Sequence, residues 1–188
     1  MRSVWILSII GLVGGCARLP DSQVPEPPWP QALAVVFDID GTLTPDVQSI
    51  ATVRPDASQA VRRYFDKGYR VVYLSTRSSL LQNGIPGWLK ANAFPGGSIH
   101  VGQTGKDDKD PALFKLRILK EYEARGWRLI GGYGDSSTDF EAYAGAGIPK
   151  NLVFALRRKG ASRCQPGAWQ SCLQGWTEHL TYIDQRRD

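Results

Sequence analysis

Apolar residues in this chain come in short runs that end abruptly in polar or acidic side chains. Five such runs are long enough for a strand and apolar on both faces, which is typical of strands buried in a parallel sheet. The runs lie at residues 33–37, 70–75, 98–101, 128–133 and 151–155. We therefore expect a mostly parallel, five-stranded sheet.

Segments with helical character separate these runs. We expect helices near residues 56–67, 79–92, 111–125 and 138–145. Strands that alternate with helices form right-handed crossovers and cover both faces of the sheet. The predicted fold is an α/β three-layer sandwich, with one packed domain over residues 31–158.

Two carboxylates follow the first run at its carboxyl end, the edge where open α/β sheets bind ligands. Asp38 and Asp40 are one residue apart, and two close carboxylates raise each other's pKa unless a cation lies between them. A hard divalent ion that takes oxygen ligands, most simply Mg2+, would relieve this repulsion. Gly41 and Thr42 then let the chain turn and offer backbone N–H groups to an anion.

The stretch Asp38-Ile39-Asp40-Gly41-Thr42-Leu43-Thr44 resembles the first motif of the haloacid-dehalogenase-like phosphohydrolases. The resemblance implies that Asp38 is the nucleophile and Asp40 the general acid and base. The family's later motifs match Ser75, a donor to the transferring phosphoryl group, Lys115, a cation near the nucleophile, and Gly134-Asp135-Ser136-Ser137-Thr138-Asp139, an acidic metal site.

These matches give a complete expected site. The catalytic residues would be Asp38, Asp40, Ser75 and Lys115, and the Mg2+ ligands would be Asp38, Asp40, Asp135 and Asp139. Phosphate would be bound by Gly41, Thr42, Ser75, Thr76 and Lys115. Attack by Asp38 would give an aspartyl-phosphate that water then hydrolyses.

Each motif also has a simpler structural interpretation. The aspartates of the first motif could form a turn after a strand, and Ser75 could cap the following helix. Lys115 could lie on a solvated helix face, and Asp139 could be a residue at the start of a helix. Four motifs in the family's order favour the catalytic interpretation.

Residues 33–158 narrow the resemblance to the lipin phosphatidate phosphatases and to the related C-terminal domain of the phosphatidylinositol transfer proteins. The residues that carry it are Arg54–Val61, Gly68–Arg77, Trp88-Leu89 and Asn92–Gly97. In the transfer proteins the nucleophilic aspartate is commonly absent, and the domain is thought to sense phosphatidic acid. This chain keeps both carboxylates, which favours an enzyme over a non-catalytic lipid-binding module.

The spacing between the motifs leaves no room for a large cap domain. Only 34 residues separate Asp40 from Ser75, and 39 separate Ser75 from Lys115. An uncapped site suits a substrate with its own bulk, such as a lipid head group at a membrane or a phosphoprotein. A phosphatase for soluble esters remains an alternative.

The first residues resemble a bacterial lipoprotein signal. Met1 and Arg2 precede an apolar stretch that is too short to span a membrane and ends at Cys16, which would be lipid-modified. An ordinary secretory signal is the alternative. We expect residues 1–15 to be removed and residues 16–30, rich in proline, to form an extended tether. Ala17 after the cysteine resembles lipoproteins of the outer membrane, which indicates an anchor on its periplasmic face.

The remaining features add less. The net charge is +5, and basic clusters at 157–159 and 186–187 could favour an anionic membrane or simply be solvated. No basic stripe interleaved with aromatic residues suggests nucleic acid. Residues 159–188 form a tail in which Cys164 and Cys172 are expected to form a disulfide, as suits an oxidising compartment.

Overall fold

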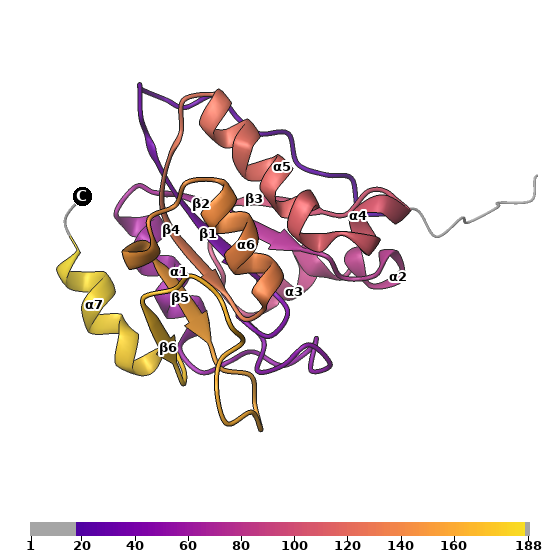
Figure 1. Ribbon diagram of the computed structural model, residues 1–188, viewed down its shortest axis with the longest axis vertical. Helices are drawn as coiled ribbons and strands as arrows, with labels where there is room; N and C mark the ends of the chain where they lie inside the picture. The colour runs from indigo at the N-terminus through magenta and orange to yellow at the C-terminus, as the bar shows by residue number, and fades with distance from the viewer. Residues whose placement is uncertain (1–17, 187–188) are drawn as a thin grey trace, which may run out of the picture.

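The computed structural model describes residues 18–186 and contains one six-stranded sheet (Figure 1). Every neighbouring pair of strands is parallel, and the order across the sheet is β3-β2-β1-β4-β5-β6. The strands are β1 (Leu33–Asp38), β2 (Arg70–Ser75), β3 (Ser98–Val101), β4 (Arg128–Gly134), β5 (Val153–Leu156) and β6 (Ser171–Leu173). The predicted α/β fold with a parallel sheet is confirmed.

The strand order reverses between β1 and β4. From β1 the chain adds β2 and β3 on one side, and then returns to the other side of β1 to add β4, β5 and β6. Loops leave the sheet in opposite directions at such a point, so a crevice opens beyond the carboxyl ends of the two strands. Asp38 closes β1 and Asp135 follows β4, so the fold itself brings these two carboxylates to the crevice.

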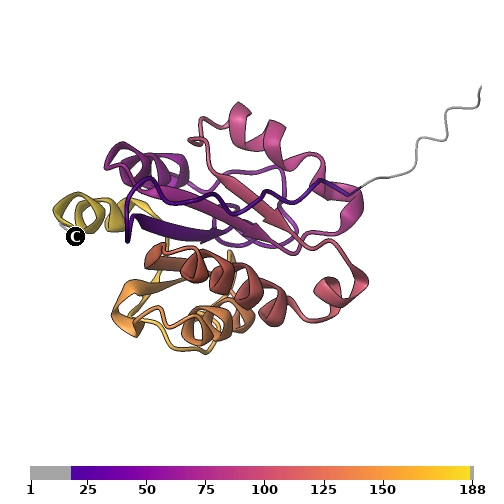
Figure 2. The same ribbon diagram turned by 90° about the horizontal axis from the view of Figure 1, so that it is seen from above.

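Helices cover both faces of the sheet, as Figure 2 shows. The longer helices are α1 (Ala57–Asp66), α5 (Pro111–Ala124) and α6 (Ser137–Gly145). Shorter ones are α2 (Ser79–Gln82), α3 (Ile85–Ala91), α4 (Gly105–Lys109), α7 (Leu180–Gln185) and the 3-10 turns η1 (Lys150–Leu152) and η2 (Thr177–His179). The core on one face includes side chains of α1, α3 and α7, and the core on the other includes side chains of α5 and α6.

Alternation along β1 explains both cores. Val35 and Phe37 point into the first core, whereas Ala34 and Val36 point into the second, and all four are fully buried. Side chains of a strand alternate between the two faces, so a run apolar at every position must lie between two covered faces. The expected three-layer sandwich has this arrangement, and no large cap domain lies over it within residues 18–186.

The number of strands predicted from the sequence was wrong by one. β6 is only three residues long and lies in the Gly-, Pro- and Gln-rich tail, where no apolar run marks a strand. It pairs with β5, with Cys172 beside Ala155, and Cys172 is bonded to Cys164 in a disulfide. The tail after residue 158 therefore completes the sheet, and α7 adds Ile183 to the core beside α1.

The helix expected at 79–92 is divided. α2 ends at Gln82, and α3 begins at Ile85 with Pro86 in its first turn. Proline has no N–H to donate and is tolerated only in the first turn of a helix. Pro86 therefore starts a new helix instead of continuing the old one. α4, which the pattern did not predict, depends on a capping box between Thr104 and Asp107.

The tether expected at residues 16–30 is not free where the structure describes it. Val24 is buried in the second core, and the Trp127 indole donates to the carbonyl of Pro25 at 2.7 Å. The Ser22 N–H donates to the carbonyl of Ile99 on β3 at 3.0 Å. A few apolar and hydroxyl side chains of this segment are enough to hold it against the domain. The predicted signal at 1–15 and Cys16 lie outside the described residues.

His179 gives the fold a specific sensitivity to pH. It is buried, its Nε2 lies 2.9 Å from the hydroxyl of Tyr133, and its ring stacks on Tyr182. Burial lowers the pKa of His179 from 6.5 to about 4, an effect that the neighbouring Glu178 partly opposes. Between these two values the unfolded chain binds a proton at this residue that the folded chain does not bind, so stability falls as the pH falls through this window.

We expect His179 to account for a loss of up to about 3 kcal/mol in the free energy of unfolding between pH 7 and pH 4. Urea unfolding of the wild-type chain and of His179→Gln at a series of pH values measures this. The variant should show a shallower decline, because glutamine does not titrate. Equal pH dependence in the two proteins would show that His179 is not protonated differently on unfolding.

Candidate active site

Asp38 and Lys115 form the centre of the site. Lys115 projects from α5 toward the end of β1, and its Nζ donates to Asp38 Oδ1 at 2.6 Å. The same ammonium also donates to Asp139 Oδ1. The side chains of all three residues are at least nine-tenths buried. A buried ion pair is stable only when good geometry and further hydrogen bonds offset the loss of water, and here one lysine serves two carboxylates.

Asp139 positions the start of α6. Its Oδ2 accepts from the backbone N–H of Asp135 at 3.1 Å and of Ser136 at 3.0 Å, and from the Ser136 hydroxyl at 2.9 Å. Both of its oxygens therefore have partners, because Oδ1 is held by Lys115. Asp139 is thus a residue at the start of a helix, as its simpler interpretation expected, and its side chain also lies in the acidic cluster.

Asp135 is held from the other side by Arg158. The Arg158 Nε donates to Asp135 Oδ2. Gly41 lies directly beside this carboxylate, with φ +92°, and a Cβ at position 41 would collide with the Asp135 side chain. Only glycine meets both conditions, because L-residues rarely adopt such a φ and have a Cβ that would occupy this space.

Asp40 belongs to a second group of polar side chains. The Ser75 hydroxyl donates to Asp40 Oδ2 at 2.9 Å. Arg77 donates through Nε to both oxygens of Asp40, at 3.1 and 3.2 Å, and through a terminal nitrogen to Oδ1 at 2.6 Å. Planar guanidinium groups suit carboxylates in this bidentate way. Asp40 is thereby fixed at the mouth of the site, where its side chain keeps 16% exposure.

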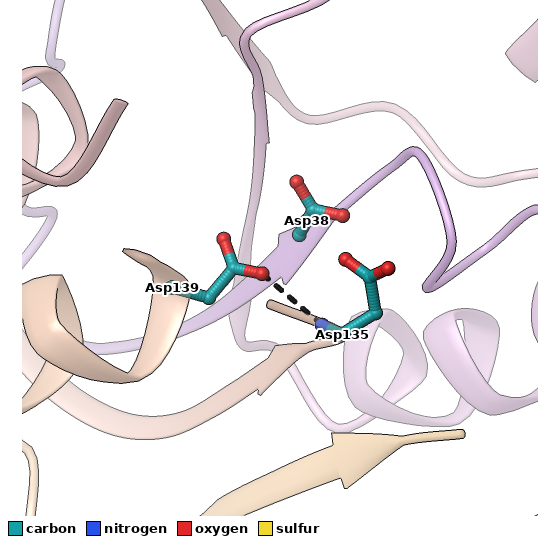
Figure 3. Close-up of side chains that lie close together, drawn as sticks. All are labelled: Asp38, Asp135 and Asp139. Atoms are coloured by element: carbon teal, nitrogen blue, oxygen red, sulfur yellow. Dashed lines mark hydrogen bonds between the residues drawn. The ribbon is translucent and has the colours of Figure 1, made fainter. Parts of the chain in front are cut away.

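The acidic cluster fits a divalent cation. Asp38, Asp135 and Asp139 offer oxygens that lie within 4.8 Å of one another, and Figure 3 shows the three carboxylates gathered in one place. Asp38 Oδ2 is buried and has no hydrogen-bond partner in the protein. A buried carboxylate oxygen without a partner is costly, and a cation at this position would remove that cost.

The charges of the site support the same conclusion. Four carboxylates are paired with three cations, Lys115, Arg77 and Arg158, so one negative charge is in excess. Burial raises the pKa of Asp38 well above its usual range, although Lys115 opposes this rise. Burial, together with the nearby Asp139, also raises the pKa of Asp135 to about 6. A divalent ion would keep both groups ionised and leave one positive charge for an anionic ligand.

Lys115 remains charged in spite of its burial. Desolvation alone would lower the pKa of its ammonium, but Asp139 and Asp38 outweigh this effect and raise the pKa above its ordinary value. Lys115 is therefore a permanent cation beside Asp38. The simpler interpretation of Lys115, as a residue on a solvated helix face, was wrong, because only 2% of the residue is exposed.

The residues expected to bind phosphate differ in whether their polar groups already have a partner in the protein. Thr76 lies on the wall of the cleft, and the fully buried Thr42 has a hydroxyl with no partner in the protein. The N–H of Gly41 donates to the Thr44 hydroxyl at 2.8 Å and is not free for an anion. Ser75 is bonded to Asp40, so it can turn toward a ligand only by leaving that carboxylate.

A cleft of about 350 Å³ opens above these groups. Its polar lining residues include Asp38, Asp40, Arg77, Lys115, Asp135 and Arg158, and its apolar lining residues are Val47, Ile50, Leu81 and Pro111. The cleft is open toward solvent, because no inserted domain covers it in the described part of the chain.

Three arginines of the site were not among the site residues expected from the sequence. Arg77 and Arg158 contact Asp40 and Asp135 as described above. Arg54 is buried and donates to the carbonyls of Gly41, at 2.8 Å, and of Pro45, at 3.1 Å, so it fixes the loop after β1. The position of Arg77, two residues after the end of β2, could have indicated that it lies at the site. Nothing local in the sequence indicates the long-range contacts of Arg54 and Arg158.

Substitution of Gly41 tests the geometry of the acidic cluster. Gly41→Ala places a Cβ against Asp135 and should weaken divalent-cation binding about 10- to 100-fold, as when a neighbour that orients a metal ligand is disturbed. Titration calorimetry with Mg2+ measures this effect.

Gly68→Ala is the matched control. Gly68 has a similar φ of +82°, but nothing lies within 4 Å of the added Cβ. Both variants should lose about 1–2 kcal/mol of stability from backbone strain, and only Gly41→Ala should lose affinity for the cation. Equal loss of affinity in both variants would mean that strain, and not the contact with Asp135, is responsible.

The family model of the PITM 1-3 LNS2 domain matches residues 35–157 of this chain. Membrane-associated phosphatidylinositol transfer protein 1 of Rattus norvegicus is 30% identical over 156 residues, which are 80% of this chain and 12% of the rat protein. Protein retinal degeneration B of Drosophila melanogaster is 27% identical over 135 residues, 70% of this chain and 10% of that protein. The chain thus spans about an eighth or less of these relatives.

Two solved structures share the fold at low sequence identity. A HAD-like phosphatase of Mesorhizobium loti superposes with a TM-score of 0.60 at 14% identity, over 89% of this chain and 94% of that one. The D,D-heptose 1.7-bisphosphate phosphatase of B. bronchiseptica, complexed with magnesium and phosphate, gives 0.58 at 18% identity, over 81% and 97%. The expected resemblance is confirmed: the chain has the fold of the HAD-like phosphatases and belongs to the LNS2 domain family of the PITM 1-3 proteins.

Proposed function

We propose that this protein is a Mg2+-dependent phosphomonoester hydrolase that acts through an aspartyl-phosphate at Asp38. The observation that carries the proposal is the state of Asp38 itself. Lys115 holds its Oδ1, and the side chain lines an open cleft at the end of β1. A carboxylate held in one orientation at such a cleft is suited to nucleophilic attack.

The reaction has two displacements. The Asp38 carboxylate attacks phosphorus, and the bond to the leaving oxygen breaks while Asp40, which must be protonated for this step, gives that oxygen its proton. Asp40 then takes a proton from water, which attacks the same phosphorus and releases Asp38 and inorganic phosphate. Lys115 next to the nucleophile, and Ser75 once it turns from Asp40, would stabilise the charge on the transferring oxygens.

Mg2+ would neutralise charge on the phosphoryl oxygens. Asp38 and Asp135 are the side chains suited to hold it, together with the main-chain carbonyl of Asp40. Asp139 was expected to be a ligand as well. Because both of its oxygens are hydrogen-bonded, we assign it instead to the positioning of Lys115 and of the chain at Asp135.

We propose a lipid phosphate such as phosphatidic acid as the substrate. The open cleft is lined by apolar residues as well as by Arg77 and Arg158, which suits an anionic head group joined to hydrocarbon. The relatives are described as membrane-associated phosphatidylinositol transfer proteins. The expected lipoprotein signal would place the domain at the periplasmic face of the outer membrane, although that signal lies outside the described residues.

Two alternatives make different demands on the site. A module that only binds lipid needs neither Asp38 nor Asp40, whereas this site keeps both and gives each of them a cationic partner. A phosphatase for soluble esters would use the same polar groups but would not need the apolar residues that line the cleft.

Asp38→Asn tests the mechanism. The amide cannot act as the nucleophile, and Mg2+-dependent phosphate release should fall by roughly four orders of magnitude or more. Release by the wild-type chain should also stop with a chelator and return with added Mg2+. Asp66→Asn, an exposed carboxylate at the end of α1, is the control and should retain full activity. Turnover by Asp38→Asn near the wild-type rate would refute the mechanism.

Comparison of substrates tests the proposed class. Phosphatidic acid in vesicles should have a higher kcat/KM than a short soluble ester, because binding energy from the lipid can be used at the reacting centre. Phosphate release from both, measured at equal Mg2+, decides the question. Hydrolysis of sugar phosphates or nucleotides but not of vesicle lipid would replace the lipid substrate with a soluble one and leave the role of Asp38 intact.

A further inference from the structure

The first described residue of the chain lies at the catalytic edge of the sheet. Arg18 donates to the carbonyl of Gly102, directly after β3, at 2.7 Å, and forms an ion pair with Asp108 on α4 at 2.7 Å. Figure 1 shows the start of the described chain beside α4, on the side of the molecule where α2 lies. The carboxyl ends of parallel strands share one edge, so Arg18 lies at the same edge as Asp38.

The same carbonyl joins Arg18 to α2. The Gln82 side chain at the end of α2 donates to the carbonyl of Gly102 at 3.1 Å, and also to that of Arg77 at 2.8 Å. The Gly102 carbonyl therefore joins Arg18 to α2, and the Gln82 amide joins α2 to Arg77, which lines the cleft. The N-terminal segment is thus linked to the cleft through a short series of hydrogen bonds.

Exposed apolar side chains gather at this edge. Leu80 is 71% exposed, Leu81 45% and Val47 44%, and Leu81 and Val47 line the cleft. We call these three residues the apolar rim. Leu113, in the first turn of α5, is 60% exposed at the same edge. The other large apolar side chains of comparable exposure in the described chain, Trp29 and Phe65, lie at the opposite edge, before β1 and at the end of α1.

Cations lie next to the apolar rim. The backbone N–H of Lys159 donates to the carbonyl of Pro45 at 2.8 Å, two residues before Val47, and the Lys159 side chain is exposed. Arg158 lines the cleft. Exposed apolar side chains beside an exposed lysine are suited to a bilayer with anionic lipids, because the apolar groups enter the acyl region and the ammonium stays at the head groups.

We propose that the catalytic edge lies flat on the bilayer in which Cys16 is anchored, with the apolar rim inserted around the cleft. This proposal rests on the function proposed above and adds the orientation in which the enzyme meets its substrate. Cys16 is two residues before Arg18, and two residues span at most about 7 Å. A lipid on Cys16 would therefore hold the mouth of the cleft at the membrane surface, instead of leaving the domain to move on a long tether.

The orientation can be measured directly with methyl groups. The full lipidated chain carrying Asp38→Asn, which cannot consume lipid, is placed in vesicles of phosphatidylcholine with a minority of phosphatidylglycerol. Nitroxide-labelled acyl chains should broaden the methyl signals of Leu80, Leu81 and Val47, relative to unlabelled lipid. The methyl signals of Leu33, at the start of β1 on the opposite edge, should be unchanged. Broadening of Leu33 alone, or of none of these residues, would overturn the proposal.

A kinetic experiment supplies the second test. Leu80→Asp should lower the ratio of kcat/KM for vesicle phosphatidic acid to that for a soluble ester by about tenfold or more, because an inserted side chain becomes charged. Phe65→Asp is the matched control at the opposite edge and should leave the ratio unchanged. Equal ratios in Leu80→Asp, Phe65→Asp and the wild-type chain would refute docking through the apolar rim.

The two proposals can fail separately. Mg2+-dependent turnover without broadening of the apolar rim would refute the orientation and leave the hydrolase. Broadening of the apolar rim without turnover of any phosphate ester by the wild-type chain would refute the hydrolase and leave the docking. Mass spectrometry of Cys16→Ser and of the wild-type chain identifies the anchor, and an unmodified Cys16 in the wild-type chain would overturn the proposed orientation.

Discussion

The accumulation of buried carboxylates at one edge of the sheet is the constraint on which the rest of the structure depends. Asp38, Asp135 and Asp139 lie beyond the carboxyl ends of β1 and β4, where burial removes most of their contact with water. Lys115 joins two of them from α5, and Arg158 holds the third from the chain after β5. The positions of α5, α6 and the segment after β5 are thus fixed in part by the need to neutralise these charges, in addition to apolar packing.

The Lys115 contacts also explain why the acidic cluster is suited to a divalent cation. One ammonium that serves two carboxylates leaves a deficit of positive charge, which a divalent ion can supply. Removal of one partner of a buried pair is far more costly than the pair is stabilising. The site therefore depends on its full set of partners, and Gly41 must be glycine for the last of them, Asp135, to fit.

Much of this arrangement could be predicted from the sequence, because strands that are buried on both faces and end in polar residues can be recognised as apolar runs with an abrupt polar end. The sheet's first five strands, the longer helices and the position of Asp38, Ser75 and Asp135 at one edge follow from that pattern, whereas Lys115 was expected from the family resemblance. β6 and Arg158 could not be predicted, since a three-residue strand has no periodicity and a long-range ion pair has no local signature. The docking of residues 18–30 was missed because proline content masks a single buried Val24.

That N-terminal segment has a consequence for solubility. β3 is an edge strand, and an uncovered edge is a template for pairing with strands of other molecules. Ser22 occupies this edge, since its N–H donates to the Ile99 carbonyl and its hydroxyl accepts from the Ile99 N–H at 2.9 Å. The opposite edge, β6, is only three residues long and is tied by the disulfide. The segment around Ser22 thus also covers an edge of the sheet, and proteolysis between Arg18 and Pro25 would expose that edge and promote aggregation.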